Sequence, residues 1–503
     1  MMSTLIQILV ILIIVLYTAS LLFILCYSLT QASLVGRYLF GRKKYKAAQQ
    51  PLKQFATLPL VTVQLPIYNE KYVAERLIDC IAGLDYPADK LEIQVLDDST
   101  DETRQIIADR ILQLSGHINI THLHRTNRKG FKAGALKDGL AKSSGEFIAI
   151  FDADFLPPKN FLLKTIPYFA DDNVGMVQTK WAWLNRNYSI LTRVQAFALD
   201  AHFSVEQVGR NIKNGFINFN GTAGVWRKVC ILDAGNWQAD TLTEDLDLSY
   251  RAQLKNWKFV YLEELLSPSE LPPVMSAIKT QQYRWNKGGA ETARKHLRKV
   301  IFANKPLQVK WHGIVHLLTS GVFLSAFVCA FLSVPMLWVR HRYPAYASFF
   351  TLANYCFISF IILGVMYLVT AAMQYKSRWQ AAFQFVQTMP VFLALSMGLT
   401  LHNAIAVLQG YSGRRTPFVR TPKFNLVHKG DHWQANQYLK SNVNKLTTGE
   451  IFMMLYFLGG ILLAFYLKDF TLLPFHILLM LGYGGVVYFT LRPRTPRKGV
   501  LVA

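Results

Sequence analysis

The sequence predicts an open, mostly parallel α/β sheet joined to an α-helical transmembrane region. Two observations support this fold class. Short apolar strands alternate with helices between residues 60 and 151, a pattern typical of a parallel sheet. Apolar runs long enough to cross a bilayer lie near the N-terminus and after residue 311, and the hydrophobic residues, 52% of the chain, are concentrated there. A chain of 503 residues also exceeds the usual size of one domain.

The globular part is predicted to cover residues 55–303. Its strands are expected at residues 60–65, 91–96, 118–123 and 147–151, with helices at 70–84 and 102–114. Polar residues collect where these strands end. Ligands of open α/β sheets bind at the carboxyl ends of the strands, so we expect the functional site at that edge.

The membrane part is predicted on both sides of the globular domain. Residues 1–30 are expected to form an uncleaved transmembrane helix, because the apolar run is too long for a signal peptide and no basic segment precedes it. The basic linker that follows, residues 31–54, places the globular domain in the cytoplasm by the positive-inside rule. We expect four more spans within residues 304–491, and then a basic cytoplasmic tail, residues 492–503.

The segment near residues 383–409 is ambiguous. If it spans, the following loop with Arg414, Arg415, Arg420 and Lys423 lies outside, against the positive-inside rule. We therefore predict an interfacial or re-entrant segment and five spans in all, with six spans as the alternative.

The net charge of +23 favours an anionic partner. Nucleic acid, anionic lipid headgroups and a phosphorylated substrate compete, and the membrane spans make nucleic acid the weakest of the three. The five cysteines have no CxxC spacing and indicate neither a disulfide framework nor a zinc site.

Two carboxylates follow the fourth predicted strand. Asp152 and Asp154 are two residues apart, so on an extended segment they project to the same side. Together they suit Mg²⁺ or Mn²⁺, hard cations that complete their shell with substrate phosphates. The competing interpretation is a solvated turn.

A second acidic pair opens a predicted helix. Thr243 is a good N-cap, and Glu244 and Asp245 in the first turn can simply complement the helix dipole. The functional alternative is that Asp245 is a general base that deprotonates an acceptor hydroxyl.

Donor and acceptor contacts are predicted from three further segments. Asp97 and Asp98 end the second strand, where a carboxylate can contact a nucleotide. Lys129 and Lys132 lie in a glycine-containing basic segment that either binds a diphosphate or is simply a solvated loop. The segment Gln281-Gln282-Tyr283-Arg284-Trp285 precedes the membrane region. It is either an interfacial belt or an acceptor site in which Trp285 stacks on a sugar.

In this order, the motifs resemble the family 2 processive glycosyltransferases of the cellulose synthase type, most closely the plant cellulose synthase-like A and C groups. The likeness runs from about residue 65 to 285. The motifs that carry it are Leu65-Pro66-Ile67-Tyr68-Asn69-Glu70, Val95-Leu96-Asp97-Asp98-Ser99-Thr100, Lys132-Ala133-Gly134-Ala135-Leu136, Phe151-Asp152-Ala153-Asp154-Phe155, Phe219-Asn220-Gly221-Thr222-Ala223-Gly224-Val225-Trp226-Arg227, Thr243-Glu244-Asp245 and Gln281 to Trp285.

The resemblance implies a cytoplasmic GT-A domain, metal at Asp152 and Asp154, and Asp245, beside Glu244, as the catalytic base. It implies a nucleotide-sugar donor site and an acceptor end that holds the growing glycan. The donor site comprises Tyr68, Glu70, Asp97, Asp98, Lys129, Lys132 and Asp152. The acceptor end comprises Asn220, Gly221, Thr222, Gln281, Gln282, Arg284 and Trp285.

The function expected from the resemblance is inverting transfer of a hexose to a β-linked polysaccharide. We expect UDP-glucose as donor, with GDP-mannose as the other possibility, and coupling to secretion through partners that the sequence does not identify. The alternative enzyme adds one sugar to a membrane lipid, and a non-enzymatic transporter is a third, weaker class. The short termini favour a bacterial inner membrane over the Golgi.

Overall fold

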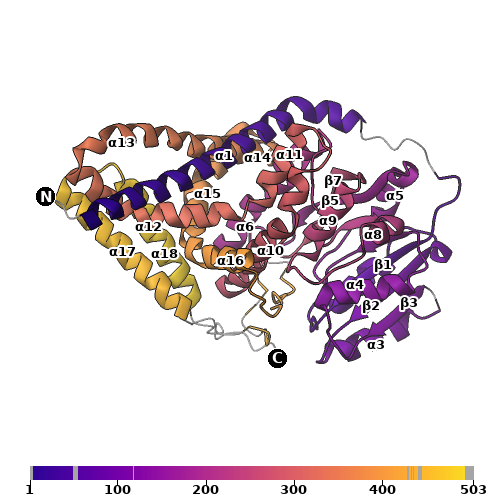
Figure 1. The fold of residues 1–503 in the computed structure, drawn as a ribbon. Coiled ribbons are helices and arrows are strands. Elements are labelled where there is room, and N and C mark those ends of the chain that lie inside the picture. Colours follow the sequence, from indigo (N-terminus) through magenta and orange to yellow (C-terminus); the bar gives the residue numbers. More distant parts are fainter. Residues whose placement is uncertain are drawn as a thin grey trace.

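The computed structural model describes residues 4–48, 55–116, 118–426, 430–431, 433, 436–439 and 445–492. A bundle of long helices lies at one end of the molecule and an α/β domain at the other, and the first helix runs beside both (Figure 1). The predicted basic tail lies outside the described residues, apart from Arg492.

The α/β domain contains, within the described residues, one sheet of seven strands in the order β3-β2-β1-β4-β6-β5-β7. β6 is antiparallel to both its neighbours, and the other pairs are parallel. The first four strands confirm the sequence prediction, whereas the last three were not predicted. The strands are β1 (Val61–Ile67), β2 (Leu91–Asp97), β3 (Asn119–His124), β4 (Phe147–Ile150), β5 (Val174–Trp183), β6 (Gly224–Arg227) and β7 (Lys258–Ser269).

Both faces of the sheet are covered, so the domain has two hydrophobic cores. Successive side chains of a strand point to opposite faces. Val61, Val63 and Leu65 of β1 therefore all pack in one core, against α2 (Ala74–Ala82) and α3 (Thr103–Leu114). The other core contains α4 (Phe131–Lys142) and the C-terminal part of the first helix.

The remaining elements of this domain connect the strands and lead back to the bundle. They are η1 (Ala88–Lys90), α5 (Phe161–Thr165), η2 (Ile166–Ala170), α6 (Ile190–Ala201), the π-helical η3 (His202–Glu206), α7 (Gln207–Asn211), α8 (Lys228–Asp233), α9 (Glu244–Leu254), α10 (Met275–Ile301) and α11 (Leu307–Leu317).

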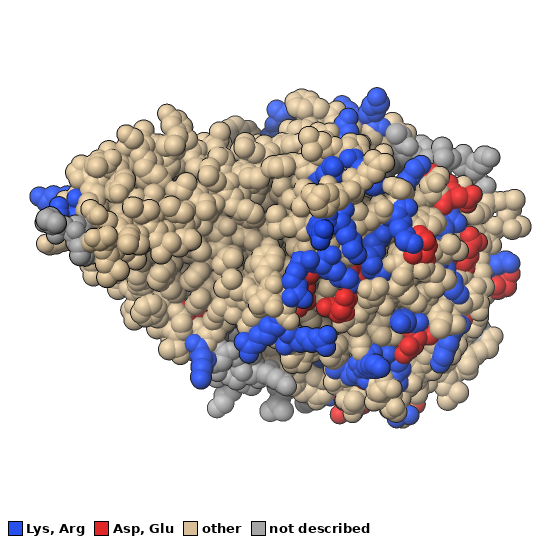
Figure 2. All heavy atoms as spheres, in the orientation of Figure 1, with Lys and Arg blue, Asp and Glu red and all other residues tan. Residues whose placement is uncertain are grey.

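Six helical segments in the described chain are long and apolar enough to cross a membrane: 4–47, 321–342, 344–374, 378–398, 445–467 and 473–491. On the face shown in Figure 2, Lys and Arg gather over the globular half, and the bundle surface is largely uncharged apart from its tip. The helices are α1 (Thr4–Ala48), α12 (Gly321–Arg342), η4 (Pro344–Tyr346), α13 (Ala347–Asn354), η5 (Tyr355–Phe357), α14 (Ile358–Gln374), α15 (Arg378–Gly398), α16 (Thr400–Ser412), α17 (Lys445–Leu467) and α18 (Leu473–Leu491).

The first helix does not end at residue 30, where the sequence predicts the boundary between the transmembrane helix and the basic linker. Helix α1 continues to Ala48, so most of the predicted linker is helical. The Tyr38 hydroxyl donates to Glu263 Oε1 over 2.7 Å, and Arg42 Nε pairs with Glu263 Oε2 at 2.7 Å. These contacts hold the end of α1 against β7.

The ambiguous segment forms two helices, α15 and α16, that lie on the globular domain. Phe197 of α6 contacts Phe385 and Phe392 of α15, and Leu399 packs in a cluster with Leu191. Helix α16 packs against α10. Helix α15 also packs along α18 and α14 of the bundle, and it is long and apolar enough to span. The interfacial or re-entrant position and the number of spans therefore both stay predictions.

A close crossing of two glycines joins α15 to α18. A Cβ added at Gly482 would lie 2.1 Å from the carbonyl oxygen of Ala394, and one added at Gly398 would lie 2.2 Å from the carbonyl oxygen of Gly482. Small residues allow such close approach of membrane helices.

We expect Gly482→Ala to destabilise the protein by about 1–3 kcal/mol, because the new methyl group overpacks the crossing. The midpoint of thermal unfolding in detergent measures the effect. Gly459→Ala in α17 is the control, because a Cβ there meets nothing within 4 Å. Equal midpoints for the two variants would contradict the prediction.

Candidate active site

A cavity lies at the carboxyl ends of the strands, and most of the predicted site residues line it. Asp154 and Asp245, which come from distant parts of the sequence, face this same cavity. The predicted residues that line it are Tyr68, Glu70, Asp98, Lys132, Asp152, Asp154, Asn220, Gly221, Glu244, Asp245, Gln281, Arg284 and Trp285.

Lys132 connects three parts of the cavity. It lies in the first turn of α4, and its ammonium contacts Asp152 Oδ1 at 2.5 Å and donates to the carbonyl oxygen of Gly221 over 2.8 Å. Glu244 Oε1 lies 3.9 Å away. One cation thus lies between the strand-end carboxylate and the acidic start of α9, where a diphosphate would need positive charge.

Asp245 lies at the start of α9 and faces a glycine. Its Oδ1 accepts a hydrogen bond from the Leu246 amide over 2.8 Å. A Cβ added to Gly221, whose φ is +82°, would lie 2.9 Å from Asp245 Oδ2. Glycine is therefore required here both for the left-handed backbone and for the space beside the carboxylate.

The buried carboxyl groups of the cavity have raised pKa values. Burial first, and then the negative charge of Glu244, raise the pKa of Asp245 to about 7, against the opposing effect of Lys132. Burial also raises the pKa of Glu244. A carboxyl group with a pKa near 7 can accept a proton and still be ionised at neutral pH.

Asp152 and Asp154 fit a divalent cation. The Asp154 side chain is 2% exposed and that of Asp152 is 34% exposed, so the pair extends from the core to the open cavity. Asp154 Oδ1 accepts no hydrogen bond of good geometry, although the Lys423 ammonium lies 2.8 Å away. A buried carboxylate oxygen in this condition is a suitable ligand for a hard cation.

The other end of the cavity combines a carboxylate with an aromatic ring. Arg125 donates to both oxygens of Asp98 over 2.7 Å each, so the plane of this carboxylate is fixed. The guanidinium of Arg128 stacks on the ring of Tyr68, 3.2 Å from its centroid. Guanidinium groups commonly stack on aromatic faces, so this contact orders Arg128 and Tyr68 at the cavity wall.

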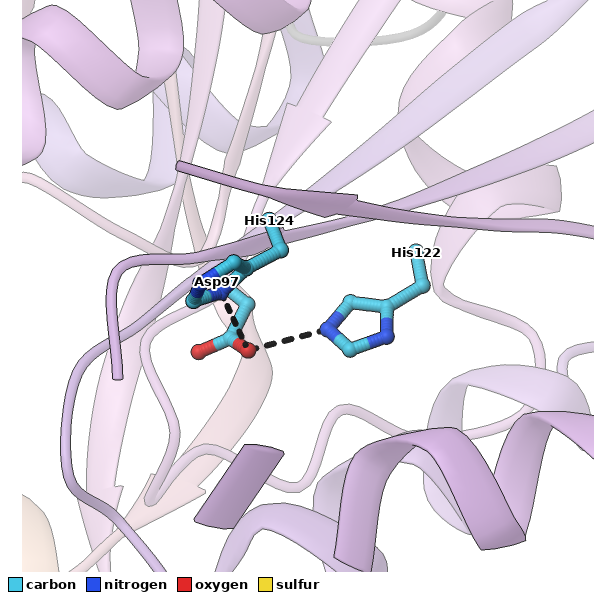
Figure 3. Close-up of side chains that lie close together, drawn as sticks. All are labelled: Asp97, His122 and His124. Atoms are coloured by element: carbon cyan, nitrogen blue, oxygen red, sulfur yellow. Dashed lines mark hydrogen bonds and ion pairs between the residues drawn. The ribbon is translucent and has the colours of Figure 1, made fainter. Parts of the chain in front are cut away.

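Four predicted site residues do not line the cavity. Asp97 points away from it and toward His122 and His124 (Figure 3). Burial opposes ionisation of Asp97, but hydrogen bonds from His122 and Ser99 outweigh it and hold the pKa of Asp97 below its usual value. Adjacent residues of a strand point to opposite sides, so only one of Asp97 and Asp98 can face the cavity. The local sequence does not determine which one does.

The other three predicted residues that lie outside the cavity lining are Thr222, Lys129 and Gln282. The Thr222 hydroxyl accepts a hydrogen bond from the backbone N–H of Asp152 over 2.8 Å and so supports the strand end from behind. Lys129 is exposed. The Gln282 carbonyl oxygen accepts from the Asn286 side chain one turn later in α10.

A loop after α16, residues 413–426, covers the cavity and supplies residues that sequence reasoning missed as site residues. Arg420 Nη1 pairs with Glu70 Oε2 at 2.6 Å, and Lys423 pairs with Asp154. Arg284 of α10 donates to the Thr421 hydroxyl over 2.9 Å. The cations of this loop were visible in the sequence, but only as evidence on membrane topology.

Glu270 is a further missed residue, at the end of β7. It accepts hydrogen bonds from the backbone N–H groups of Phe424 and Asn425, so it anchors the loop. Burial first, and then the charge of Asp154, raise the pKa of Glu270 to about 7.

His202 lies behind the predicted acceptor residue Asn220. Its Nε2 lies 3.1 Å from Asn220 Oδ1, and its Nδ1 lies 3.0 Å from Glu206 Oε2. Glu206 also accepts from Arg210 over 2.8 Å. The π-helical turn of η3 places these groups, and such turns are frequent at functional sites.

Residues 59–288 match the family described as "Glycosyltransferase like family 2". They form a family 2 glycosyltransferase domain. The predicted family and enzyme class are confirmed for this domain, and so is the GT-A fold class, with its mostly parallel sheet.

Plant enzymes resemble more than half of the chain. Glucomannan 4-beta-mannosyltransferase 1 of Cyamopsis tetragonoloba is 40% identical over 282 residues, 55% of this chain and 54% of that protein. Glucomannan 4-beta-mannosyltransferase 9 of Arabidopsis thaliana is 38% identical over 328 residues, 62% of each chain. The aligned region thus spans between about half and two thirds of these two relatives.

Among solved structures, the mannosyltransferase PcManGT from Pyrobaculum calidifontis, in complex with GDP-Man and Mn²⁺, is 19% identical. The match covers 78% of this chain and all of that one, with a TM-score of 0.49.

Proposed function

We propose that this chain is a membrane-integrated inverting glycosyltransferase that transfers mannose from a nucleotide donor to a growing β-linked polysaccharide. The observation that carries the proposal is the convergence of Asp152, Asp154, Lys132 and Asp245 on one cavity. A sugar transfer needs a diphosphate site and a base within reach of the same anomeric carbon, and this arrangement supplies both.

The proposed base is Asp245. It removes the proton from an acceptor hydroxyl while the hydroxyl oxygen forms a bond to the anomeric carbon and the bond to the nucleoside diphosphate breaks. Attack from the face opposite the leaving group inverts the configuration, so an α-linked donor gives a β-linkage. The glycine at position 221 leaves space beside Asp245 Oδ2 for the acceptor hydroxyl.

The proposed donor site extends from Asp98 and Tyr68 to Asp152 and Asp154. Lys132 neutralises charge where the diphosphate lies. A divalent cation, Mg²⁺ or Mn²⁺, would be held by Asp152 and Asp154 and would supply further neutralisation of the leaving nucleoside diphosphate. Both aspartates offer oxygen ligands in the cavity.

Mannose replaces glucose as the proposed sugar. The plant relatives are named as mannosyltransferases, which supports GDP-mannose as donor and gives no support to the expected UDP-glucose. The same names support a polysaccharide acceptor over a membrane lipid.

The proposed location is a membrane, with the glycosyltransferase domain on the cytoplasmic side and basic side chains near the lipid headgroups. The apolar helices support membrane integration. The relatives described above are plant proteins, so they give no support to the bacterial inner membrane over the Golgi. Secretion of the product through the bundle and any secretion partner remain part of the proposal.

The test supplies radiolabelled GDP-mannose or UDP-glucose to the purified chain in lipid nanodiscs. We expect label from GDP-mannose in a water-phase polymer that a β-mannanase degrades. Label confined to a solvent-extractable glycolipid would reject polymerisation, transfer from UDP-glucose alone would reject the donor, and no transfer from any nucleotide sugar would reject the enzyme assignment.

The raised pKa of Asp245 predicts a pH dependence. A base must be ionised to accept a proton, and a pKa of about 7 leaves Asp245 protonated at lower pH. We therefore expect kcat/KM to rise with pH through about 7 and then to level off. A rate that is constant through this range, or falls, would contradict the assignment.

The pH profile needs a control because Glu70 and Glu270 also have pKa values raised to about 7. Glu270→Gln removes one of these groups and leaves Asp245 in place. This variant is expected to keep the acid limb of the profile, so loss of the limb in Glu270→Gln would assign it to Glu270 instead.

A further inference from the structure

Two histidines on strand β3 face the last residue of β2. The register pairs Val95 with His122 and Asp97 with His124. Residues two apart on a strand point to the same face, so both imidazoles lie on the side of Asp97. β3 is the first strand in the sheet order and has a neighbour only at β2, which leaves this side of the site at the edge of the sheet.

The three side chains converge on one carboxylate oxygen (Figure 3). Asp97 Oδ2 lies 2.9 Å from His122 Nε2 and 3.2 Å from His124 Nδ1. The other oxygen, Oδ1, accepts a hydrogen bond from the Ser99 backbone N–H over 2.8 Å. The turn after β2 therefore holds the carboxylate so that Oδ2 faces the two rings.

The spacing of these atoms suits a small divalent cation. Zn²⁺ binds nitrogen and oxygen ligands at about 2.0–2.2 Å in a tetrahedron, which puts neighbouring ligand atoms roughly 3.3 Å apart. The three potential ligand atoms, one from each residue, all lie within 4.8 Å of one another. An ion could enter after small movements of the rings.

Asp97 is fully buried, whereas His122 and His124 are partly exposed to solvent. The Asp97 side chain is 0% exposed, whereas those of His122 and His124 are 19% and 20% exposed. An ion from solvent can thus reach the histidines, and water can complete the coordination shell of the ion on the exposed side. The Asp97 carboxylate stays in place because it is buried and accepts the hydrogen bond from Ser99.

We propose that Asp97, His122 and His124 form a metal site for Zn²⁺ or a chemically similar ion, separate from the Asp152–Asp154 pair. Imidazole nitrogens select Zn²⁺, Co²⁺ or Ni²⁺, whereas Mg²⁺ and Mn²⁺ prefer oxygen ligands alone. In the described part of the chain, this is the one group of three His, Cys, Asp or Glu side chains whose potential ligand atoms all lie within 4.8 Å of one another.

Binding shifts protons within the rings. Without an ion, the nitrogens that face Asp97 Oδ2 donate hydrogen bonds to it, because an ionised carboxylate only accepts. With an ion, these two nitrogens present lone pairs, and each neutral ring carries its proton on the opposite nitrogen. The ion therefore replaces two hydrogen bonds and joins β2 to β3.

The proposed metal site adjoins the part of the cavity that contains Asp98. Asp98, the next residue after Asp97, lines that cavity. A bound ion fixes the end of β2 and stabilises the folded state, because it binds this arrangement and not the unfolded chain. We expect Zn²⁺ to raise the midpoint of thermal unfolding.

The experiment titrates the full chain, purified in detergent without a histidine tag, with Co²⁺. Co²⁺ in a near-tetrahedral shell with nitrogen ligands gives intense visible absorption. We expect this absorption to saturate at one Co²⁺ per chain and to disappear when Zn²⁺ displaces the Co²⁺. The double variant His122→Asn, His124→Gln is expected to lose this absorption and the Zn²⁺-induced thermal shift. The affinity of the double variant for Co²⁺ at this site should fall at least about 100-fold, since even mutation of residues that only hydrogen-bond to metal ligands costs 10–100-fold in metal affinity.

Three controls separate this site from other causes. Asp152→Asn with Asp154→Asn is expected to keep the absorption, because those residues belong to the other site. His341→Asn, at an exposed histidine, is expected to keep it too. Unchanged thermal unfolding of the ion-free double variant shows that it folds. Absence of a Zn²⁺-displaceable Co²⁺ spectrum in the wild type, or its persistence in the double variant, would overturn the proposal.

Discussion

Replacing Asp245 with Asn is expected to lower sugar transfer by about 10²–10⁴-fold, the usual contribution of a general base. Asn has nearly the same shape, but it does not take a proton from an acceptor hydroxyl. Donor binding is expected to survive, because Lys132 and Asp152 stay in place. Nucleotide release with acceptor present measures the rate, and equilibrium binding of the nucleoside diphosphate measures the donor site.

Asp240→Asn is the matched control for this change. Asp240 lies five residues before Asp245, its side chain is 53% exposed, and it pairs with Lys295. It is expected to transfer sugar at the wild-type rate. Undiminished transfer by Asp245→Asn would remove this residue as the base.

The second large effect is expected at the strand-end carboxylates. Asp154→Asn should lower transfer by roughly 10²–10³-fold, because loss of a cation that neutralises the leaving diphosphate costs several kcal/mol of transition-state stabilisation. Mn²⁺ binding, followed by electron paramagnetic resonance in the presence of nucleoside diphosphate, should weaken in parallel.

Asp172→Asn provides the comparison, because its side chain is 99% exposed and lies outside the cavity lining. It is expected to retain both activity and Mn²⁺ binding. If Asp154→Asn bound Mn²⁺ as tightly as Asp172→Asn does, the assignment of Asp154 as a ligand would be wrong.

Local sequence was sufficient to predict the candidate site residues that lie at the end of one strand or the start of one helix. Asp152 follows β4 and Asp245 is in the first turn of α9, so their positions depend on local chain direction. The general rule that strand ends of an open α/β sheet share one edge predicts the position of Asp152, whereas the folded structure brings the start of α9, with Asp245, to the same cavity. Residue types at these ends therefore predicted which side chains line the cavity, and their chemical roles stay predictions.

Other parts depended on contacts between distant segments. Arg420 and Lys423 reach Glu70 and Asp154 across more than 250 residues of sequence. Their charges had suggested only a loop on one side of the membrane. A contact of this kind has no periodic signal, because nothing in the local chain specifies the partner.

What the sequence determined by itself was the class of fold, the family of the glycosyltransferase domain and the positions of the strand-end and helix-end carboxylates, because strand alternation, apolar length and short motifs are local properties. The tertiary structure decided that Asp98 and not Asp97 faces the cavity, that α1 continues past residue 30 onto β7, and that α15 lies along α6. Each depends on which surface is buried by a distant segment, and only the folded chain brings those surfaces together.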